Sequence, residues 1–196
     1  MPANEVVKRI HDAIEKNTSQ VLGVSYNGKA ITTKQYLPRA LAQSAPEISY
    51  AVPDPSSTYI VVMLDLDAPF PSLGVLGPIL HWIQPGFKAG PDNVLTSDAP
   101  FVANYIGPAP PPGSGPHRYS FYLFEQPEDF DGNKYAPAGG KPLSNWFRMR
   151  YDLDNWQKTA KLGEPLAANY FLMDTVTLGS MGVYCDCNFT SQFTLD

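Results

Sequence analysis

Near the start of the chain, apolar residues recur every three to four positions. The residues that follow this spacing are Val6, Ile10, Ala13 and Ile14. The period matches one face of an α-helix, so the pattern predicts an amphipathic helix that ends near Asn17. The helix carries charges of both signs, which disfavours a role in docking on a membrane surface.

After this segment the chain changes to short runs of β-branched and aromatic residues divided by proline and glycine. The clearest runs are 59–64 (YIVVML) and 119–124 (YSFYLF). Such runs are typical of strands, so strands and loops are expected from Ser25 to Leu123. Proline is frequent, with 20 residues, and it gathers in loops such as 107–113 (GPAPPPG). Because proline stiffens the chain, these loops are expected to form rigid walls.

Helical spacing returns near the end of the chain. A second helix is expected over about 153–162, closed by Gly163 and then Pro165. A last strand is expected to follow over about 167–172.

Length and composition limit what the chain can be. Hydrophobic residues make up 43% and charged residues 17%, which is the balance of a packed globular protein, and no repeat or linker divides the chain. We therefore expect a single domain over 1–196. The formal net charge of -5 argues against nucleic acid as a partner, since phosphate backbones demand clustered Lys and Arg. No signal peptide or membrane span is visible, so we expect a cytoplasmic protein without stable membrane insertion.

The two cysteines, Cys185 and Cys187, are separated by one residue. A disulfide between such close neighbours would be strained, and two thiols without a nearby histidine cannot complete a zinc site. We expect reduced thiols.

Two carboxylates follow the apolar run 59–64 in the segment LDLDAP. Asp65 and Asp67 stand two residues apart, and at a strand end that spacing places them on one face. The plain alternative is that Asp65 only caps a turn.

A lone histidine, His81, stands among apolar neighbours in GPILHWIQPG. The plain alternative for His81 is a core histidine bonded to a backbone carbonyl. If His81 instead faces a pocket, Trp82 should face the other side of the strand and pack in the core. We assign the core or a pocket wall to most other large aromatic residues as well: Trp146, Trp156 and Tyr170.

The most specific segment is 107–119 (GPAPPPGSGPHRY). Its glycines allow backbone amides to approach a ligand. A strand that begins at His117 places His117 and Tyr119 on one face and Arg118 on the other. Ser114 stands near His117 but lacks the strand-to-helix elbow of a nucleophilic serine, so a serine hydrolase is disfavoured.

Taken together, these segments resemble the phosphatidylethanolamine-binding protein family, which includes Raf kinase inhibitor protein, the plant flowering regulators and a carboxypeptidase Y inhibitor. The Asp-Pro-Asp-Ala-Pro signature of the family corresponds to DLDAP at 65–69, where Leu66 replaces the usual proline. The second signature, a glycine-rich element ending in His-Arg-Tyr, corresponds to 107–119. The resemblance covers about 20–171, whereas 172–196 matches nothing in the family and is compatible with an added strand, a lid or a dimer contact.

The resemblance implies a mainly β fold, a β-sandwich in which a large central sheet is flanked by a smaller sheet, with an N-terminal and a C-terminal helix. It also implies a pocket for phosphate, a phosphoryl group or a carboxylate. The expected ligand-binding residues are Asp65, Asp67, His81, Pro110, Pro111, Gly115, His117 and Tyr119, and Gly107 helps to shape the loop. Two imidazoles near a carboxylate should hold protons more readily than free histidine, so either can be cationic near neutral pH.

Two classes of function follow from this resemblance. The first is a regulatory or inhibitory binding module that recognises a small anionic ligand, a phosphorylated head group or a protein partner such as a kinase or protease. The second is an enzyme, because some fungal family members are linked to dimerising cyclisation of maleic-anhydride-type precursors. In that case Asp65 would orient one imidazole, and His81 and His117 would move protons. The same three residues resemble a metal-binding set, but the family pocket binds anions, so no metal or cofactor is expected.

Overall fold

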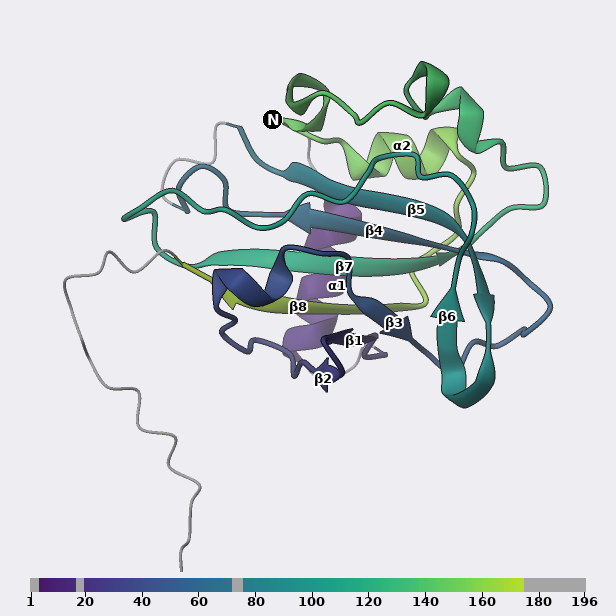
Figure 1. Ribbon diagram of the computed structural model, residues 1–196, viewed down its shortest axis with the longest axis horizontal. Coiled ribbons are helices and arrows are strands. Elements are labelled where there is room, and N and C mark those ends of the chain that lie inside the picture. The colour runs from purple at the N-terminus through teal and green to yellow at the C-terminus, as the bar shows by residue number, and fades with distance from the viewer. Residues whose placement is uncertain (1–3, 17–19, 72–75, 175–196) are drawn as a thin grey trace, which may run out of the picture.

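Eight strands form one continuous antiparallel sheet in a computed structural model that describes residues 4–16, 20–71 and 76–174. Their order across the sheet is β2-β1-β3-β6-β5-β4-β7-β8 (Figure 1). The strands are β1 Gly23–Tyr26, β2 Lys29–Ala30, β3 Glu47–Ser49, β4 Tyr59–Asp65, β5 Ile79–Ala89, β6 Val94–Thr96, β7 His117–Glu125 and β8 Ala167–Met173. The α-helices of the described ranges are α1 Glu5–Glu15 and α2 Leu153–Thr159, and the short 3-10 helices are η1 Arg39–Ala42, η2 Pro91–Asn93, η3 Gly132–Lys134, η4 Ala138–Gly140 and η5 Asn145–Arg148.

The sheet curls until its two ends meet. Just before β1, the amide of Leu22 donates to the carbonyl of Ala168 on β8, and the amide of Ala168 donates to the carbonyl of Gln20. A hydrophobic core fills the space inside the curl, with Val24 and Ile48 from the short strands against residues of β4, β7 and β8. The expected sandwich of two separate sheets is not confirmed, because the 11 residues of β5 pair with β4 and, farther along, with β6. One long strand thus joins both halves.

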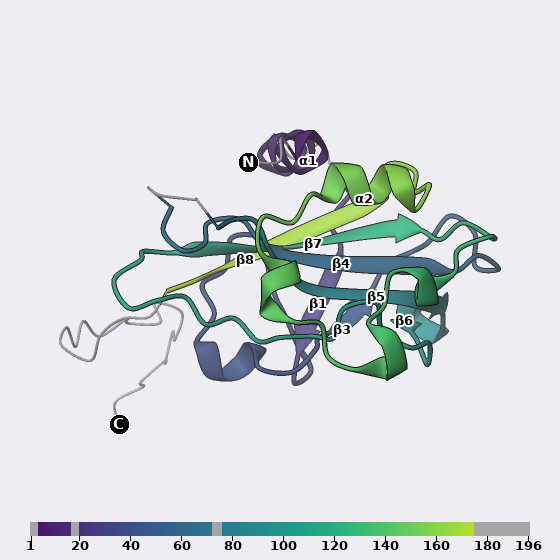
Figure 2. The same cartoon turned by 90° about the horizontal axis from the view of Figure 1, so that it is seen from above.

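The two α-helices cover the opposite face of the central strands. Figure 2 shows α1 and α2 on one side of β4 and β7, with β1 and β3 on the other. A second hydrophobic core lies beneath the helices and includes Val6 and Ile14 of α1, Trp156 of α2 and Ile60 and Tyr122 of the sheet. The predicted N-terminal helix is therefore confirmed, since the apolar face found in the sequence packs on the sheet.

The later elements also match their predictions, except for the end of α2. Helix α2 begins at Leu153 but ends at Thr159, and Lys161 takes a left-handed φ of 57° that stops the helix before the expected end. Strand β8 occupies the expected segment. Trp156 and Tyr170 are buried. Trp146 is not: it lies on η5 with 75% of its surface exposed, because η5 packs on the sheet through Arg148 instead.

No helix within the described ranges is long and apolar enough to cross a membrane. Cys185, Cys187 and the segment 175–196 lie outside the described residues. Of the unassigned segment 172–196, Leu172 and Met173 continue β8.

Helix α1 brings a buried histidine onto the sheet. Nε2 of His11 lies 2.9 Å from Oγ of Ser120 on β7, and the ring of His11 contacts that of Tyr170. Burial, assisted by the positive charge of Arg118, lowers the pKa of His11 to about 4. The folded protein therefore holds His11 in its neutral form.

We expect acid to weaken the docking of α1. The unfolded chain protonates His11 near its ordinary pKa of 6.5, above the folded value of about 4. The contribution of His11 is therefore complete above pH 6.5 and is lost as the pH falls toward 4, which is a loss of about 2–3 kcal/mol in the free energy of unfolding. Urea unfolding at pH 7.5 and pH 5 measures it. In His11→Asn the free energy of unfolding should depend less on pH than in the wild type. The same dependence in both proteins would contradict the assignment of this loss to His11.

Candidate functional site

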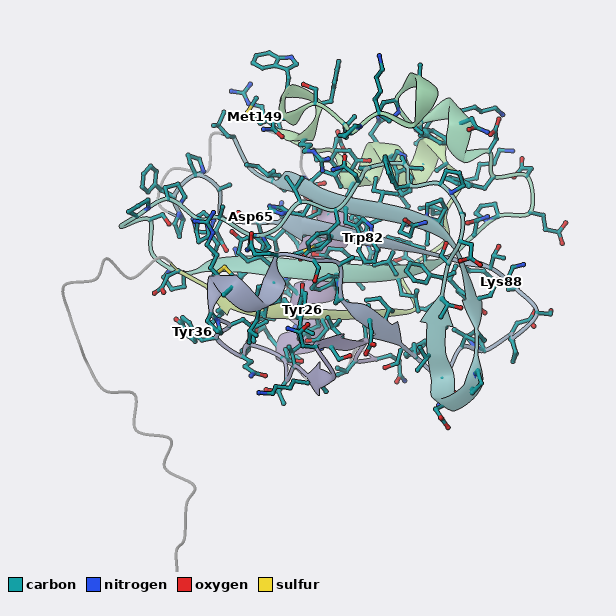
Figure 3. The ribbon with its side chains drawn as sticks, viewed as in Figure 1. Tyr26, Tyr36, Asp65, Trp82, Lys88 and Met149 are labelled. Carbon is teal, nitrogen blue, oxygen red and sulfur yellow. The ribbon has the colours of Figure 1, made fainter. Side chains whose placement is uncertain are left out.

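A cavity of about 280 Å³ lies where β4 ends and β7 begins. Its walls come from the ends of β4, β5 and β7, from the proline-rich loop and from the chain around η5. Figure 3 labels two of its residues, Asp65 on the central sheet and Met149 next to η5. The cavity therefore gathers segments that are far apart in the sequence.

Six of the eight residues expected to bind a ligand line this cavity. They are Asp65, His81, Pro110, Pro111, His117 and Tyr119, and Gly107 lines it as well. The strand register explains the last two of the six, since alternate residues of β7 face the cavity while Arg118 lies on the other face, as predicted. The proline-rich loop forms a wall, as its stiffness suggested.

The centre of the site is a buried pair, Asp65 and His117. Oδ2 of Asp65 lies 2.8 Å from Nδ1 of His117, and the two side chains are 5% and 0% exposed. The other oxygen, Oδ1, accepts a hydrogen bond of 3.0 Å from the amide of Asp67. Asp65 therefore both caps the turn after β4 and holds the imidazole.

This pair sets the protonation of His117. Burial disfavours the charged imidazole, but the hydrogen bond and the charge of Asp65, with smaller contributions from Asp67 and the carbonyl of Pro69, outweigh burial and raise the pKa of His117 above 6.5. With Nδ1 bonded to Asp65, the remaining nitrogen is Nε2, which is buried and has no hydrogen-bond partner among the described residues. His117 thus lines the cavity and keeps one N–H group without an acceptor in the described part of the chain.

The second imidazole, His81, behaves differently. Its Nδ1 lies 2.8 Å from the carbonyl oxygen of Ile106, and its ring meets that of Tyr119 edge to face at 5.2 Å. Burial lowers the pKa of His81, and the carbonyl of Ile106 and the charge of Asp65 do not compensate. The expectation that both imidazoles hold protons more readily is therefore wrong for His81. The site therefore shifts the pKa values of its two histidines in opposite directions.

A β-bulge explains how His81 reaches the cavity. Met63 pairs with Trp82 and Leu64 with Leu80, so His81 is an extra residue without a partner on β4. The bulge breaks strict alternation. Trp82 packs in the same core cluster as Met63 and Tyr119, on the cavity side of the sheet. Trp82 is in the core as predicted, but it does not face away from His81.

Two expected residues lie outside the cavity lining. The carboxylate of Asp67 accepts hydrogen bonds from Nε, Nη2 and the backbone amide of Arg118, at 2.7 to 2.8 Å. Because β4 ends at Asp65, the strand period no longer applies two residues later, and Asp67 does not share the face of Asp65. Gly115 supplies a left-handed φ of 83° to the turn before β7 and does not form part of the wall.

Arg148, which was not predicted from the sequence, lines the cavity and is only 1% exposed. Its guanidinium donates five hydrogen bonds, to the carbonyls of Leu80, His81, Asn104 and Leu143 and to Oδ1 of Asn104. Burial lowers its pKa. The signal in the sequence is an arginine that stands between two apolar residues, Phe147 and Met149.

The charged and titratable groups of the cavity come from a few side chains. In the described part of the chain, no group of three or more His, Cys, Asp or Glu is placed to hold a metal ion. Asp65 lies beside His117, whose pKa is raised, and the guanidinium of Arg148 lines the same cavity. Burial and the nearby charge of Asp65 raise the pKa of Tyr119, which keeps its hydroxyl protonated.

The family model "Phosphatidylethanolamine-binding protein" matches residues 27–171. A carboxypeptidase Y inhibitor of Saccharomyces cerevisiae is 26% identical over 85% of this chain and 89% of its own length. The protein named "Phomoidride biosynthesis cluster protein N", of Talaromyces stipitatus, is 33% identical over 81% of this chain and 86% of its own length.

Solved structures show the same fold. The crystal structure of a carboxypeptidase Y inhibitor complexed with its cognate proteinase matches with a TM-score of 0.67 and 26% identity, over 87% of this chain and 94% of the other. The phosphatidylethanolamine-binding protein from Plasmodium vivax matches with a TM-score of 0.57 and 20% identity, over 88% of this chain and 97% of the other.

Proposed function

This chain belongs to the phosphatidylethanolamine-binding protein family, and from that premise we propose that it is a binding module whose small cavity takes up a phosphoryl or carboxylate group. The observation that carries the proposal is the buried Nε2 of His117, which has no hydrogen-bond partner within the ranges that the structure describes. A buried donor without an acceptor is costly, and a bound anion removes that cost.

Charge and size favour the same class of ligand. The hydrogen bond to Asp65 fixes the orientation of His117, so Nε2 is held in place before a ligand arrives. Arg148 adds positive charge, although its own hydrogen bonds are already used. A cavity of about 280 Å³ accommodates a head group or a small dicarboxylate and is too small for a lipid with its chains.

A regulatory role through a protein partner fits this binding mode. The relative named carboxypeptidase Y inhibitor has a solved complex with its cognate proteinase. For the present chain we propose by analogy that the cavity recognises an acidic or phosphorylated group of a partner protein such as a protease or kinase.

The test is an NMR titration of the imidazole signals with inorganic phosphate, phosphoethanolamine and maleate. We expect saturable shifts of the His117 ring, larger than those of His81, because His117 carries the free donor. The variant His117→Gln should lose at least tenfold in affinity. His11→Gln is the matched control, since His11 lies on α1 against the opposite face of the sheet. No shift with any of the three anions would overturn the proposal.

A second candidate function is an acid-base enzyme acting on a dicarboxylate. The observation that favours it is the opposite shift in pKa of the two imidazoles, since such a split assigns an acid to His117 and a base to His81. The named biosynthesis-cluster relative is compatible with it. The maleate arm of the titration separates the two candidates, because preferential binding of maleate would favour the enzyme. The enzyme should then also consume a substituted maleate, and this consumption should stop when either His81 or His117 is replaced.

A further inference from the structure

A second and larger cavity, of about 730 Å³, lies on the helix side of β5. It shares no lining residue with the smaller cavity. Neighbours in the sequence separate the two: Leu80 lines the larger cavity and His81 the smaller, and Phe147 and Arg148 divide in the same way. The larger cavity is therefore a distinct site and does not depend on the anion binding proposed above.

The walls of this larger cavity are mostly apolar. Leu80, Ile83 and Val102 come from the core beneath the helices, and Trp156 of α2 completes that side. Its volume lies in the range of small-molecule sites, which is about 300–1,000 Å³. A bare phosphate ion would leave most of this apolar surface unfilled, so the cavity fits a ligand with a substantial apolar part.

The charged residues of the lining have one sign. Its described residues include no aspartate or glutamate, whereas Lys134 and Lys141 both line the cavity and are exposed to solvent. Neither lysine forms a salt bridge in the described ranges. Asp129, whose pKa is lowered in part by the charge of Lys134, forms its salt bridge with Lys161 instead. Two positive charges beside an apolar cavity favour an anionic group on the ligand.

Trp156 gives this cavity a sensitive reporter. Its Nε1 is buried and has no hydrogen-bond partner in residues 4–16, 20–71 and 76–174, although Trp156 lies in ring contact with Phe130 and Tyr135. The signal of an indole proton without an acceptor responds to any oxygen or chain placed nearby. The chain contains three tryptophans, so each indole signal can be assigned separately.

We infer that this cavity binds an amphipathic carboxylic acid, with the apolar chain against Leu80 and Trp156 and the carboxylate beside Lys134 and Lys141. The apolar walls account for the chain. The paired lysines, unopposed by a carboxylate in the lining, account for the acid head. Decanoate is a suitable probe.

The experiment follows the indole signals of the full chain during a titration with decanoate. We expect a saturable shift of the Trp156 signal, assigned with Trp156→Phe, while the signals of Trp82 and of the His117 ring stay in place. The double variant Lys134→Gln/Lys141→Gln should bind decanoate roughly three- to tenfold more weakly. The matched control, Lys29→Gln/Lys158→Gln, removes the same charge from exposed positions outside the cavity and should bind as the wild type does.

Three results would overturn the inference. Trp156 could fail to respond, which would leave the cavity unoccupied. Decanol could bind as tightly as decanoate, which would remove the role of the lysines. A shift of the His117 ring in place of Trp156 would put the carboxylate in the smaller cavity and would support the function proposed above instead.

Discussion

Replacing Asp65 by asparagine is expected to lower the anion affinity of the small cavity about 10- to 100-fold at pH 7.5. Asp65 supplies the hydrogen bond and the charge that raise the pKa of His117, and burial alone lowers that pKa. Each unit by which the pKa then lies below the pH costs a factor of ten in the cationic form. Calorimetric titration with phosphate at pH 7.5 and pH 5.5 measures the loss and its recovery in acid.

Asp67→Asn is the matched control for this variant. It makes the same chemical change two residues along the chain, at a carboxylate that binds Arg118 and lies outside the cavity. The charge of Asp67 also raises the pKa of His117, but as a smaller contribution, so a loss of at most a few fold is expected. Wild-type affinity in Asp65→Asn at pH 7.5, or equal losses in both variants, would contradict the assignment.

The buried pair of Asp65 and His117 also makes the free energy of unfolding depend on pH. The folded pKa of His117 lies above the ordinary value of 6.5, so folding favours its charged form. This contribution is complete below pH 6.5 and is lost as the pH rises through the folded pKa. His11 and His81, whose pKa values are lowered, act in the opposite sense. In Asp65→Asn, the decrease in the free energy of unfolding that accompanies a rise in pH above 6.5 should disappear.

Much of the fold could be predicted because the patterns involved are local. The spacing of apolar residues in 5–15 reflects the buried side of a helix, and the continuous runs at 59–64 and 119–124 reflect strands that are buried on both faces. Those elements are present. Sheet connectivity is not local. Nothing in the residues of β5 says that its first part pairs with β4 and its last part with β6, so the two expected sheets are one.

The same distinction applies to the site. Strand alternation placed His117 and Tyr119 together, but alternation stops where β4 ends, which is why Asp67 was misplaced. The β-bulge at His81 likewise depends on pairing with β4 and not on the residues of β5 alone. Arg148 could not be found through a complementary side chain, because four of its five hydrogen bonds go to backbone carbonyls, which every residue carries.

Replacing Arg148 by methionine is expected to lower the free energy of unfolding by about 3–5 kcal/mol. Methionine fills part of the space but donates no hydrogen bond. The carbonyls of Leu80 and Leu143 then lose the guanidinium donor, and the side-chain oxygen of Asn104 keeps only the amide of Leu143. Because these bonds fix η5 to β5, the wall of the small cavity should loosen as well. Urea unfolding measures the stability, and phosphate titration measures the cavity.

Two further variants separate the hydrogen bonds of Arg148 from its charge. Arg148→Lys keeps the charge but not the planar fork that reaches several carbonyls, so its stability should fall between wild type and Arg148→Met. Arg150→Met changes an exposed arginine two residues away and should cost less than about 1 kcal/mol. If Arg148→Lys recovers anion affinity more fully than stability, the charge of Arg148 acts on the ligand and its hydrogen bonds act on the fold. Equal stability of Arg148→Met and Arg150→Met would show that η5 is held by other contacts.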